Sequence, residues 1–335
     1  MPARRTRFLG SGHYLPERVV PNDELALLME TDDAWIRKNT GIESRHFIAP
    51  GQGTSDLALH AARNALDDAG LQASDLDLII FATLSPDVFF PGSGVLLGHK
   101  LAIPGVPALD VRNQCSGFLY GLQCADAMIR AGVYRHILLV GAEVHSTGLD
   151  LTTEGRDVAV LFGDGAGAVV LGANDDDDGR GVLHTVLGAD GSYADSLWCR
   201  APASGQHPQR ITHEDLDAKA HFPQMQGRVV FRHAVSRMRD VTLQALAEAH
   251  VELDAVELFI PHQANLRINE LVQRTLKVPA ERFYNNIARL GNTTAATIPI
   301  GIDECRRAGR IEPGTLLCCM AFGSGFTWGA SLIRW

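Results

Sequence analysis

The sequence predicts an α/β protein built from two similar halves. Apolar runs of strand length alternate with amphipathic stretches of helical period along its 335 residues, which is typical of strands connected by helices. A length of 335 residues favours two domains or one large duplicated domain. Apolar residues make up 46% of the chain and charged residues 21%, so a sizeable core is available and disorder is not expected.

The first half contains one clear helix signal and three clear strand signals. Ser55–Ala69 predicts a helix, because its apolar residues recur on one face and Gly70 supplies a stop. Leu78–Ala82, His136–Val140 and Ala166–Leu171 predict buried strands, because each is a short and mostly apolar run.

The segment Gly172–Gly181 divides the chain near its middle. Four consecutive aspartates, 175–178, lie between its glycines, but their spacing does not match a calcium-binding loop. We therefore expect a solvated linker, with an N-terminal half at 1–174 and a C-terminal half at 180–335.

The second half repeats this layout without repeating the sequence. Phe231–Ala249 predicts a long helix. The run at 78–84 precedes Cys115 by about the interval that separates Leu258–Pro261 from Asn292, and a strand-like run follows each of these two polar residues. The parallel indicates duplication of one set of strand–helix units, with chance similarity as the alternative.

The segment Ala189–Arg228 interrupts the layout. It is polar, rich in His, Gln and Pro, and long for a connection. Long loops inside compact domains tend to be functional or mobile, so we expect part of this segment to border the functional site.

Three polar side chains each follow a predicted buried strand. They are Cys115 in the segment NQCSG, His262 in PHQAN, and Asn292 in GNTTAA. Strand ends that lead into turns are where α/β proteins place their chemistry. A thiol can accept an acyl group, while an imidazole and an amide can donate hydrogen bonds to a carbonyl, so the trio suits chemistry on thioesters.

Cys115 is expected at a strand-to-helix turn. The extended run Val106–Val111 precedes it, and apolar residues recur at helical spacing from Phe118 to Ile129 after it. At a helix N-terminus, the dipole and free N–H groups would lower the thiol pKa and favour a thiolate. The alternative is a small buried hydrophobe, which is the common fate of an isolated cysteine.

Neither His262 nor Asn292 indicates a catalytic role by itself, but the two together do. Most of the 13 histidines can be structural or exposed, and an asparagine in a turn is commonly a cap. An Asn partner would leave His262 neutral, whereas a carboxylate would raise its pKa. Two neutral donors could then stabilise an enolate formed from a thioester.

A turn of small residues follows the predicted strand Leu316–Ala321. Phe322–Gly329 reads FGSGFTWG, and small residues there let backbone N–H groups approach a substrate oxygen. The alternative is a tight turn into the last strand.

Composition argues against several other classes of protein. The net charge of −9 disfavours general nucleic-acid binding. The six cysteines form no C-x-x-C pair and no zinc spacing, so we expect free thiols in a reducing cytoplasm and no metal. No apolar run reaches membrane-spanning length, and no apolar stretch accompanies the N-terminal arginines, so we expect no signal peptide.

These segments, in this order, resemble the β-ketoacyl-ACP synthase III family of the thiolase superfamily, where ACP is the acyl carrier protein. The likeness covers nearly the whole chain and includes Thr31–Gly41, Phe162–Ala168 and the closing Thr327–Gly329. It implies a thiolase-like duplicated five-layer α/β/α/β/α fold and a homodimer. It also implies decarboxylative condensation of an acyl thioester, from acyl-CoA or acyl-ACP, with malonyl-ACP to give 3-oxoacyl-ACP, without a cofactor.

The resemblance also implies roles for the catalytic residues. Cys115 would be the acylated nucleophile, while His262 and Asn292 would promote decarboxylation and condensation. The backbone N–H groups of Cys115 and Ser324 would form the oxyanion hole, and Phe322 would lie close to the malonyl site.

Further residues would bind substrates and partners by the same resemblance. Trp35 and Arg156 would hold the CoA nucleotide, and Phe90 would reach the acyl pocket of the partner subunit. A basic patch would bind the acidic carrier protein, with a solvated helix face as the alternative for each of its arginines, Arg232, Arg267 and Arg274.

The chain departs from the family pattern at three places. Asn39 stands where an arginine is common in the CoA site, which weakens CoA as the acyl donor. Ser324 replaces a glycine, although its backbone donor survives the change. Ala189–Arg228 is longer than in compact members, so the acyl pocket need not be acetyl-sized.

Two other functions remain open at this point. The protein could be an acyltransferase of specialised metabolism that passes its acyl group to an alcohol or amine, or a non-catalytic carrier-binding partner subunit. Retention of the Cys, His and Asn set favours condensation. The acyl chain length, the donor and the pathway are left open.

Overall fold

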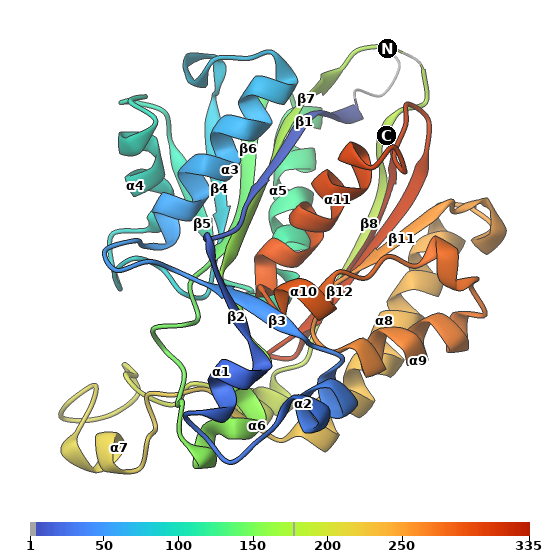
Figure 1. Ribbon diagram of the computed structural model, residues 1–335. Helices are drawn as coiled ribbons and strands as arrows, with labels where there is room; N and C mark the ends of the chain where they lie inside the picture. Colours follow the sequence, from blue (N-terminus) through green and yellow to red (C-terminus); the bar gives the residue numbers. More distant parts are fainter. Residues whose placement is uncertain (1–4, 177) are drawn as a thin grey trace.

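The computed structural model describes residues 5–176 and 178–335. These residues form five layers, in the order helices, sheet, helices, sheet, helices (Figure 1). This arrangement confirms the predicted five-layer α/β/α/β/α architecture.

The first sheet has the strand order β1-β7-β6-β4-β5. Strand β4 lies parallel to β5 and β6, whereas β7 lies antiparallel to β6 and β1. The bounds are Arg5–Tyr14 for β1, Leu78–Ala82 for β4, Ala108–Val111 for β5, His136–Glu143 for β6 and Gly165–Asn174 for β7.

The second sheet has the order β11-β12-β13-β8. Strand β11 lies parallel to β12, and β13 lies antiparallel to β12 and β8. The bounds are Gly181–Ala189 for β8, Leu258–Pro261 for β11, Leu316–Gly323 for β12 and Thr327–Arg334 for β13.

The two sheets share one topology. From β1 and from β8 alike, the next two pairings are antiparallel and the third is parallel. The predicted linker is shorter than expected, because β7 continues to Asn174 and β8 begins at Gly181. We propose on this symmetry that the halves are 1–174 and 180–335, divided in the β7–β8 turn.

Helices cover the outer faces of both sheets and fill the layer between them (Figure 1). Gly10 and Gly12 of β1 let α3 approach the first sheet, because a Cβ at either would lie 2.4 Å from the α3 backbone. The outer helices are α3 Thr54–Ala69, α4 Ser93–Lys100, α8 Gly227–Glu248 and α9 Leu266–Leu276, and the central ones are α5 Gly117–Arg130 and α11 Thr297–Arg307.

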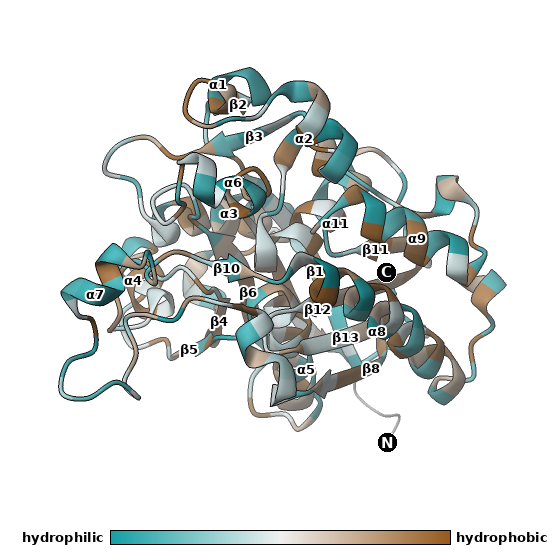
Figure 2. Ribbon diagram, turned by 90° about the horizontal axis from the view of Figure 1, so that it is seen from below, coloured by the Kyte–Doolittle hydropathy of each residue, from teal (hydrophilic) through white to brown (hydrophobic). Residues whose placement is uncertain are grey.

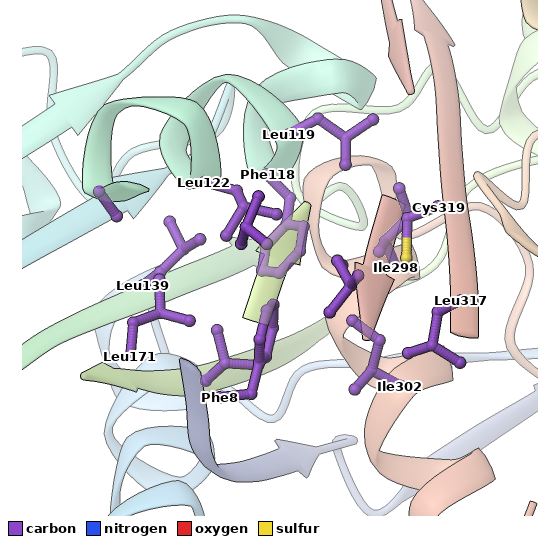
Figure 3. Close-up of a cluster of buried hydrophobic side chains, with 14 of the residues drawn as sticks. Phe8, Phe118, Leu119, Leu122, Leu139, Leu171, Ile298, Ile302, Leu317 and Cys319 are labelled. Atoms are coloured by element: carbon purple, nitrogen blue, oxygen red, sulfur yellow. The ribbon is translucent and has the colours of Figure 1, made fainter. Parts of the chain in front are cut away.

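The central helices carry a core that joins both sheets. Figure 3 shows Phe118 and Leu122 of α5 facing Ile298 and Ile302 of α11, with Leu139 and Leu317 from the two sheets on either side. All of these side chains are buried. Since α5 begins directly after Cys115, this core fixes the position of the predicted nucleophile.

The outer helices are amphipathic, as helices on a soluble surface require. Figure 2 shows α8 and α9 with both hydrophilic and hydrophobic residues along their lengths. Val230, Ala234, Met238 and Val272 from these two helices join one buried cluster, so their apolar faces pack against the second sheet.

Short strands and helices gather near one end of the two sheets (Figure 1), and short 3₁₀ turns lie along the chain. The strands are β2 Arg18–Pro21, β3 Ser44–Phe47, β9 Leu197–Trp198 and β10 Gln224–Met225. The helices are α1 Asn22–Ala26, α2 Asp33–Thr40, α6 Arg156–Ala159, α7 His213–Asp217 and α10 Ile287–Leu290. The 3₁₀ turns are Ala73–Asp75, Gln114–Ser116, Thr153–Gly155, Gly191–Ser196, Leu253–Ala255, Ala280–Arg282 and Thr294–Ala296.

The predicted elements agree with this arrangement. Helix α3 ends at Gly70, which adopts the left-handed conformation with a φ of 66°, as a C-terminal glycine stop requires. Strand β4 has the predicted bounds, and β6 and β7 extend past theirs. Helix α8 begins at Gly227, four residues before the predicted start at Phe231.

Candidate active site

Cys115 lies in the 3₁₀ turn Gln114–Ser116, directly before α5, as predicted. The preceding Gln114 has a φ of +44°, a conformation that non-glycine residues seldom adopt. Backbone strain of this kind persists where the surrounding structure enforces it, and it often marks functional sites. The side chain of Cys115 is 7% exposed.

The Cys115 thiol is neutral at rest, which corrects the expected thiolate. Burial raises the pKa of the thiol to about 12, and the Glu143 carboxylate acts in the same direction. Hydrogen bonds from the backbone N–H groups of Cys115 and Ser324 lower the pKa by less. Desolvation therefore outweighs the position at a helix N-terminus, and the thiol must lose its proton during attack.

His262 follows β11 and is held from both ends. Its backbone N–H donates to the Met320 carbonyl at 2.7 Å, and its Nδ1 lies 2.8 Å from the Thr297 hydroxyl. That hydroxyl also lies 2.9 Å from the Thr294 carbonyl. Because a hydroxyl can donate or accept, either tautomer of His262 keeps a partner at Nδ1.

The imidazole of His262 is neutral because it is buried. Burial lowers its pKa to about 3, against a smaller raising effect from the Thr294 backbone. We expected a neutral imidazole from the Asn partner, so the expected state holds for a different cause. Its Nε2 is buried and has no hydrogen-bond partner among the described residues, which leaves this atom available to a substrate.

Asn292 lies in a turn that its own side chain closes. Its Oδ1 accepts from the Thr294 N–H at 2.8 Å, and its backbone N–H donates to the Leu161 carbonyl at 2.8 Å. The side-chain oxygen is thus engaged, and the NH₂ end of the amide remains as the donor.

The three predicted residues line one cavity of about 380 Å³. Phe322, Trp35 and Asn39 line the same cavity, as do Asn265 and Arg228. Residues from both halves of the chain therefore meet around one thiol. Cys115 and Asn292 are more than 170 positions apart in the sequence.

A second cavity of about 650 Å³ also reaches Cys115. Phe89, His145, Thr294 and Ser324 contribute to its lining. Cys115 therefore lies between two cavities, one with the predicted His and Asn and one without them.

The turn after β12 closes over Cys115. A Cβ at Gly323 would lie 3.0 Å from the Cβ and the backbone nitrogen of Cys115, a tighter approach than side chains normally allow. The Ser324 hydroxyl donates to the Leu197 carbonyl, so its side chain is engaged away from the thiol. The Ser324 N–H bonds to the Cys115 sulfur and lowers the pKa of the thiol, while its role in an oxyanion hole stays a prediction.

Trp35 and Arg156 lie against each other. The Arg156 guanidinium carbon is 4.7 Å from the centroid of the Trp35 ring, and Arg156 donates to the Glu30 carbonyl at 2.6 Å. Asn39 is exposed and bonds within its own helix, from its side chain to the Trp35 carbonyl at 2.8 Å. The two residues predicted to hold a CoA nucleotide are thus adjacent, on the same side of Cys115 as the first cavity.

Phe90 lies outside both cavities of its own chain. It is 77% exposed, in the loop between β4 and α4, and its ring centroid is 6.1 Å from that of Phe89. Phe89 lines the second cavity instead. The predicted contact of Phe90 with a partner subunit stays a prediction.

The three predicted docking arginines lie on two packed helices, α8 and α9. Arg232 and Arg274 are exposed. Arg267 is engaged differently, because it pairs with Glu270 at 3.2 Å and donates to the Lys38 carbonyl at 3.1 Å. Arg232 and Arg274 are therefore better placed than Arg267 to meet an acidic partner.

Part of the segment Ala189–Arg228 borders the site, which confirms that expectation. Leu197 lines both cavities, Met225 and Arg228 line the first, and Trp198 lines the second.

Sequence reasoning missed several residues that complete the site. No turn signal precedes Arg228, His145 or Glu143. Thr294 and Thr297 lie in the segment around Asn292, where the sequence predicted a role for the asparagine only. The Gly-Asn-Thr-Thr run was a usable signal, because hydroxyls beside a polar turn commonly bond to it.

Neither a metal cluster nor a membrane span emerges from residues 5–176 and 178–335. No group of three or more His, Cys, Asp or Glu in these ranges could hold a metal ion, and no helix there is long and apolar enough to cross a membrane.

Comparisons with known proteins agree in sequence and in structure. The family model 3-oxoacyl-[acyl-carrier-protein (ACP)] synthase III matches residues 109–191, and the model of its C-terminal part matches residues 246–335. A β-ketoacyl-[acyl-carrier-protein] synthase III from Rhodospirillum rubrum is 46% identical over 334 residues, which cover 98% of this chain and 99% of that protein.

Solved structures show the same fold. The crystal structure of 3-oxoacyl-[acyl-carrier-protein] synthase III from Aquifex aeolicus VF5 has a TM-score of 0.89 at 38% identity, covering 98% of this chain and 100% of that one. The priming β-ketosynthase from the R1128 polyketide biosynthetic pathway has a TM-score of 0.89 at 30% identity, covering 100% and 97%. The predicted thiolase-like fold is thereby confirmed.

Proposed function

Because this chain belongs to the 3-oxoacyl-[acyl-carrier-protein] synthase III family, we propose that it condenses an acyl thioester with malonyl-ACP to give 3-oxoacyl-ACP. The observation that carries the proposal is the meeting of Cys115, His262 and Asn292 around one cavity. A thiol, a neutral imidazole and an amide donor are the groups that the two half-reactions need.

In the first half-reaction, Cys115 attacks the carbonyl carbon of an acyl thioester. The thiol proton passes to Nε2 of His262 and then to the departing sulfur, so one C–S bond forms as another breaks and a free thiol leaves. The N–H groups of Cys115 and Ser324 stabilise the negative charge that develops on the carbonyl oxygen.

In the second half-reaction, malonyl-ACP takes the place of the released thiol. Asn292 donates a hydrogen bond to its thioester oxygen, and so does His262 in the tautomer that carries Nε2–H, in which the Thr297 hydroxyl donates to Nδ1; both bonds stabilise the enolate that forms as CO₂ leaves. The enolate carbon attacks the acyl carbonyl, a carbon–carbon bond forms, and the Cys115 sulfur departs as a thiolate and takes up a proton from solvent. The balance involves no net oxidation or reduction, so it requires no redox cofactor.

The proposed substrates and partners follow from the first cavity and the neighbouring helices. Trp35 and Arg156 would bind the nucleotide of an acyl-CoA donor by stacking, with acyl-ACP as the alternative donor, and Phe322 would contact the malonyl group. Arg232 and Arg274, with Arg267, would attract the acidic carrier protein.

The proposed assembly is a homodimer in which Phe90 reaches the partner subunit. All six cysteines are free thiols, which supports a reducing cytoplasmic location.

A condensation assay tests the proposal. Purified protein incubated with an acyl-CoA and malonyl-ACP should release CO₂ and form 3-oxoacyl-ACP. Cys115→Ala should abolish the product, and Asn292→Ala should lower the rate by about a hundredfold or more, as expected for loss of one oxyanion donor. Cys124→Ala, a free cysteine on α5, the helix that follows Cys115, is the matched control and should retain activity.

Two outcomes would overturn the assignment. Full condensation by Cys115→Ala would remove the nucleophile from the mechanism. Transfer of the acyl group to an alcohol or amine, with no product from malonyl-ACP, would favour the alternative acyltransferase.

A further inference from the structure

The two cavities at Cys115 have different tasks under the proposed function. Malonyl-ACP must reach the acyl-enzyme on the side where His262 and Asn292 lie, which is the first cavity. The acyl chain bound to Cys115 must leave that space free, so it lies in the second cavity. The lining of the second cavity therefore selects the acyl group.

His145 is a buried polar side chain of that lining that the proposed mechanism does not use. It is 6% exposed and follows the end of β6. Its backbone N–H donates to Asp164 Oδ1 at 2.6 Å, and its ring centroid lies 4.6 Å from that of Phe162. Backbone and ring are both held, so the imidazole has a fixed orientation.

A chain of hydrogen bonds sets the tautomer of His145. Its Nε2 lies 3.1 Å from the Thr294 hydroxyl, and that hydroxyl bonds to the Glu143 carboxylate. Burial raises the pKa of Glu143, whereas hydrogen bonds from Ser85, Thr294, Leu84 and Thr83 lower it. The N–H groups of Leu84 and Ser85 and the Ser85 hydroxyl all donate to its oxygens, so Glu143 acts as an acceptor in this network. Thr294 then donates to Glu143 and accepts from Nε2–H, which leaves Nδ1 of His145 with a lone pair.

Within the described residues, the side chain of His145 makes one hydrogen bond, from Nε2 to Thr294. The lone pair on Nδ1 therefore has no partner there. Burial lowers the pKa of His145 to about 3, so the ring stays neutral and Nδ1 remains an acceptor. Nδ1 is not one of the fully buried polar atoms of the described residues that lack a partner, so it is open to the second cavity, where a donor on a bound ligand can bond to it.

We infer that His145 determines acyl specificity, by accepting a hydrogen bond from a hydroxyl group on the acyl chain. The second cavity would thus prefer a hydroxyacyl thioester to an unsubstituted acyl thioester of the same length. This inference rests on the proposed function, because it needs the acyl chain on Cys115.

The remaining lining fits such a group. Gln114 and Arg112 add polar side chains to the second cavity, while Phe89, Leu197 and Trp198 supply apolar surface for a carbon chain. A volume of about 650 Å³ exceeds the needs of a two-carbon acyl group. A site built to bond a substrate hydroxyl discriminates strongly against the analogue that lacks it.

Matched acyl donors test the inference. Wild-type protein would be incubated with hexanoyl-CoA and with 2-hydroxyhexanoyl-CoA or 3-hydroxyhexanoyl-CoA, and the rate of acylation of Cys115 would be followed by intact-protein mass spectrometry. We expect one hydroxy isomer to react at least about tenfold faster than hexanoyl-CoA, as one buried hydrogen bond allows. His145→Leu, which keeps the volume and removes the acceptor, should abolish that ratio.

The outcomes separate this inference from the proposed function. Acylation by hexanoyl-CoA at or above the rate of both hydroxy isomers in the wild type would overturn the inference alone. A ratio that His145→Leu leaves unchanged would do the same. Absence of an adduct from every donor would instead overturn the proposed function.

Discussion

The Cys115 thiol and the His262 imidazole are both neutral in the resting protein, because each is buried. Burial raises the pKa of the thiol to about 12 and lowers the pKa of the imidazole to about 3. A resting ion pair is therefore absent, and the proton moves only when a thioester arrives. Such a site protects the thiol from adventitious electrophiles, since the thiolate is the reactive form.

The buried histidines also make stability depend on pH. His145 has a pKa lowered from 6.5 to about 3 by burial, so the unfolded chain binds a proton there that the folded chain does not. Its contribution is present above pH 6.5 and is lost as the pH falls toward about 3, by up to about 1.4 kcal/mol per pH unit.

His145→Leu tests this dependence. Between pH 7 and pH 5, the free energy of unfolding of the variant should fall less steeply than that of the wild type, by about 1–2 kcal/mol over the interval. Urea titrations at several pH values would measure both slopes. Equal slopes would show that the imidazole is not held neutral.

The sequence allowed the prediction of the three catalytic candidates but not of their surroundings. Cys115, His262 and Asn292 each follow an apolar run, a local signal that one segment carries by itself. The bond from His145 to Thr294 joins residues 149 positions apart, and no local pattern predicts such a pair. The thiol pKa was misjudged for the same reason, because distant segments bury the sulfur.

Among the elements, the turn after β12 has the tightest contact with the nucleophile. Gly323→Ala would place a Cβ 3.0 Å from Cys115, so the turn must shift and carry the Ser324 N–H with it. We expect acylation of Cys115 to slow at least tenfold, since loss of one oxyanion donor costs about 2.7–4 kcal/mol.

Gly191→Ala is the control for that substitution, because a Cβ there meets nothing within 4 Å. It should leave the acylation rate unchanged. A Gly323→Ala variant with the wild-type rate would show that the turn does not position the donor.

Arg228, in the first turn of α8, places a positive charge at the first cavity. The family pattern has its arginine at the position of Asn39 instead. Arg228 is exposed and lines the first cavity with Trp35 and Asn39. We propose that Arg228 contacts a phosphate of the acyl-CoA donor. Arg228→Gln should then raise KM for acyl-CoA severalfold with little change in kcat, because such a contact contributes equally to the binding of substrate and transition state.

Arg63→Gln on α3, an exposed arginine remote from both linings, is the control and should leave KM unchanged. Steady-state kinetics with an acyl-CoA measure both variants. An unaltered KM in Arg228→Gln would exclude this residue from the donor site.

The bounds of helices and strands were predicted most accurately where the local sequence signal was strong. Helix α3 and strand β4 were predicted within a residue, because α3 has helical periodicity followed by the stop at Gly70, and β4 is a short continuous apolar run. The observed α8 begins four residues before the predicted start, because Gly227 and the β-branched Val229 and Val230 have weak helix propensity and gave no local signal.

At the scale of the whole molecule, one edge of the first sheet is apolar and open. Strand β5 forms that edge, and Leu109 on it is 37% exposed. Val88, Phe89 and Phe90 nearby are 48%, 60% and 77% exposed. An apolar patch beside an unpaired edge strand is the kind of surface that a second subunit covers, which supports the proposed homodimer.

Light scattering during size exclusion tests the assembly. The wild type should have a mass of about 72 kDa, twice the chain mass of 36.2 kDa. Phe90→Glu should shift the population toward monomer, because it buries a charge in the apolar contact, while Leu27→Glu, at the exposed C-terminal cap of α1, should not. A monomeric wild type would contradict the dimer.

The most direct test of the whole account is the mass of the intact protein before and after malonyl-ACP. Incubation with an acyl-CoA should add one acyl group at Cys115, and addition of malonyl-ACP should remove it as 3-oxoacyl-ACP. An adduct on another residue, or an acyl group on Cys115 that malonyl-ACP leaves in place, would contradict the account.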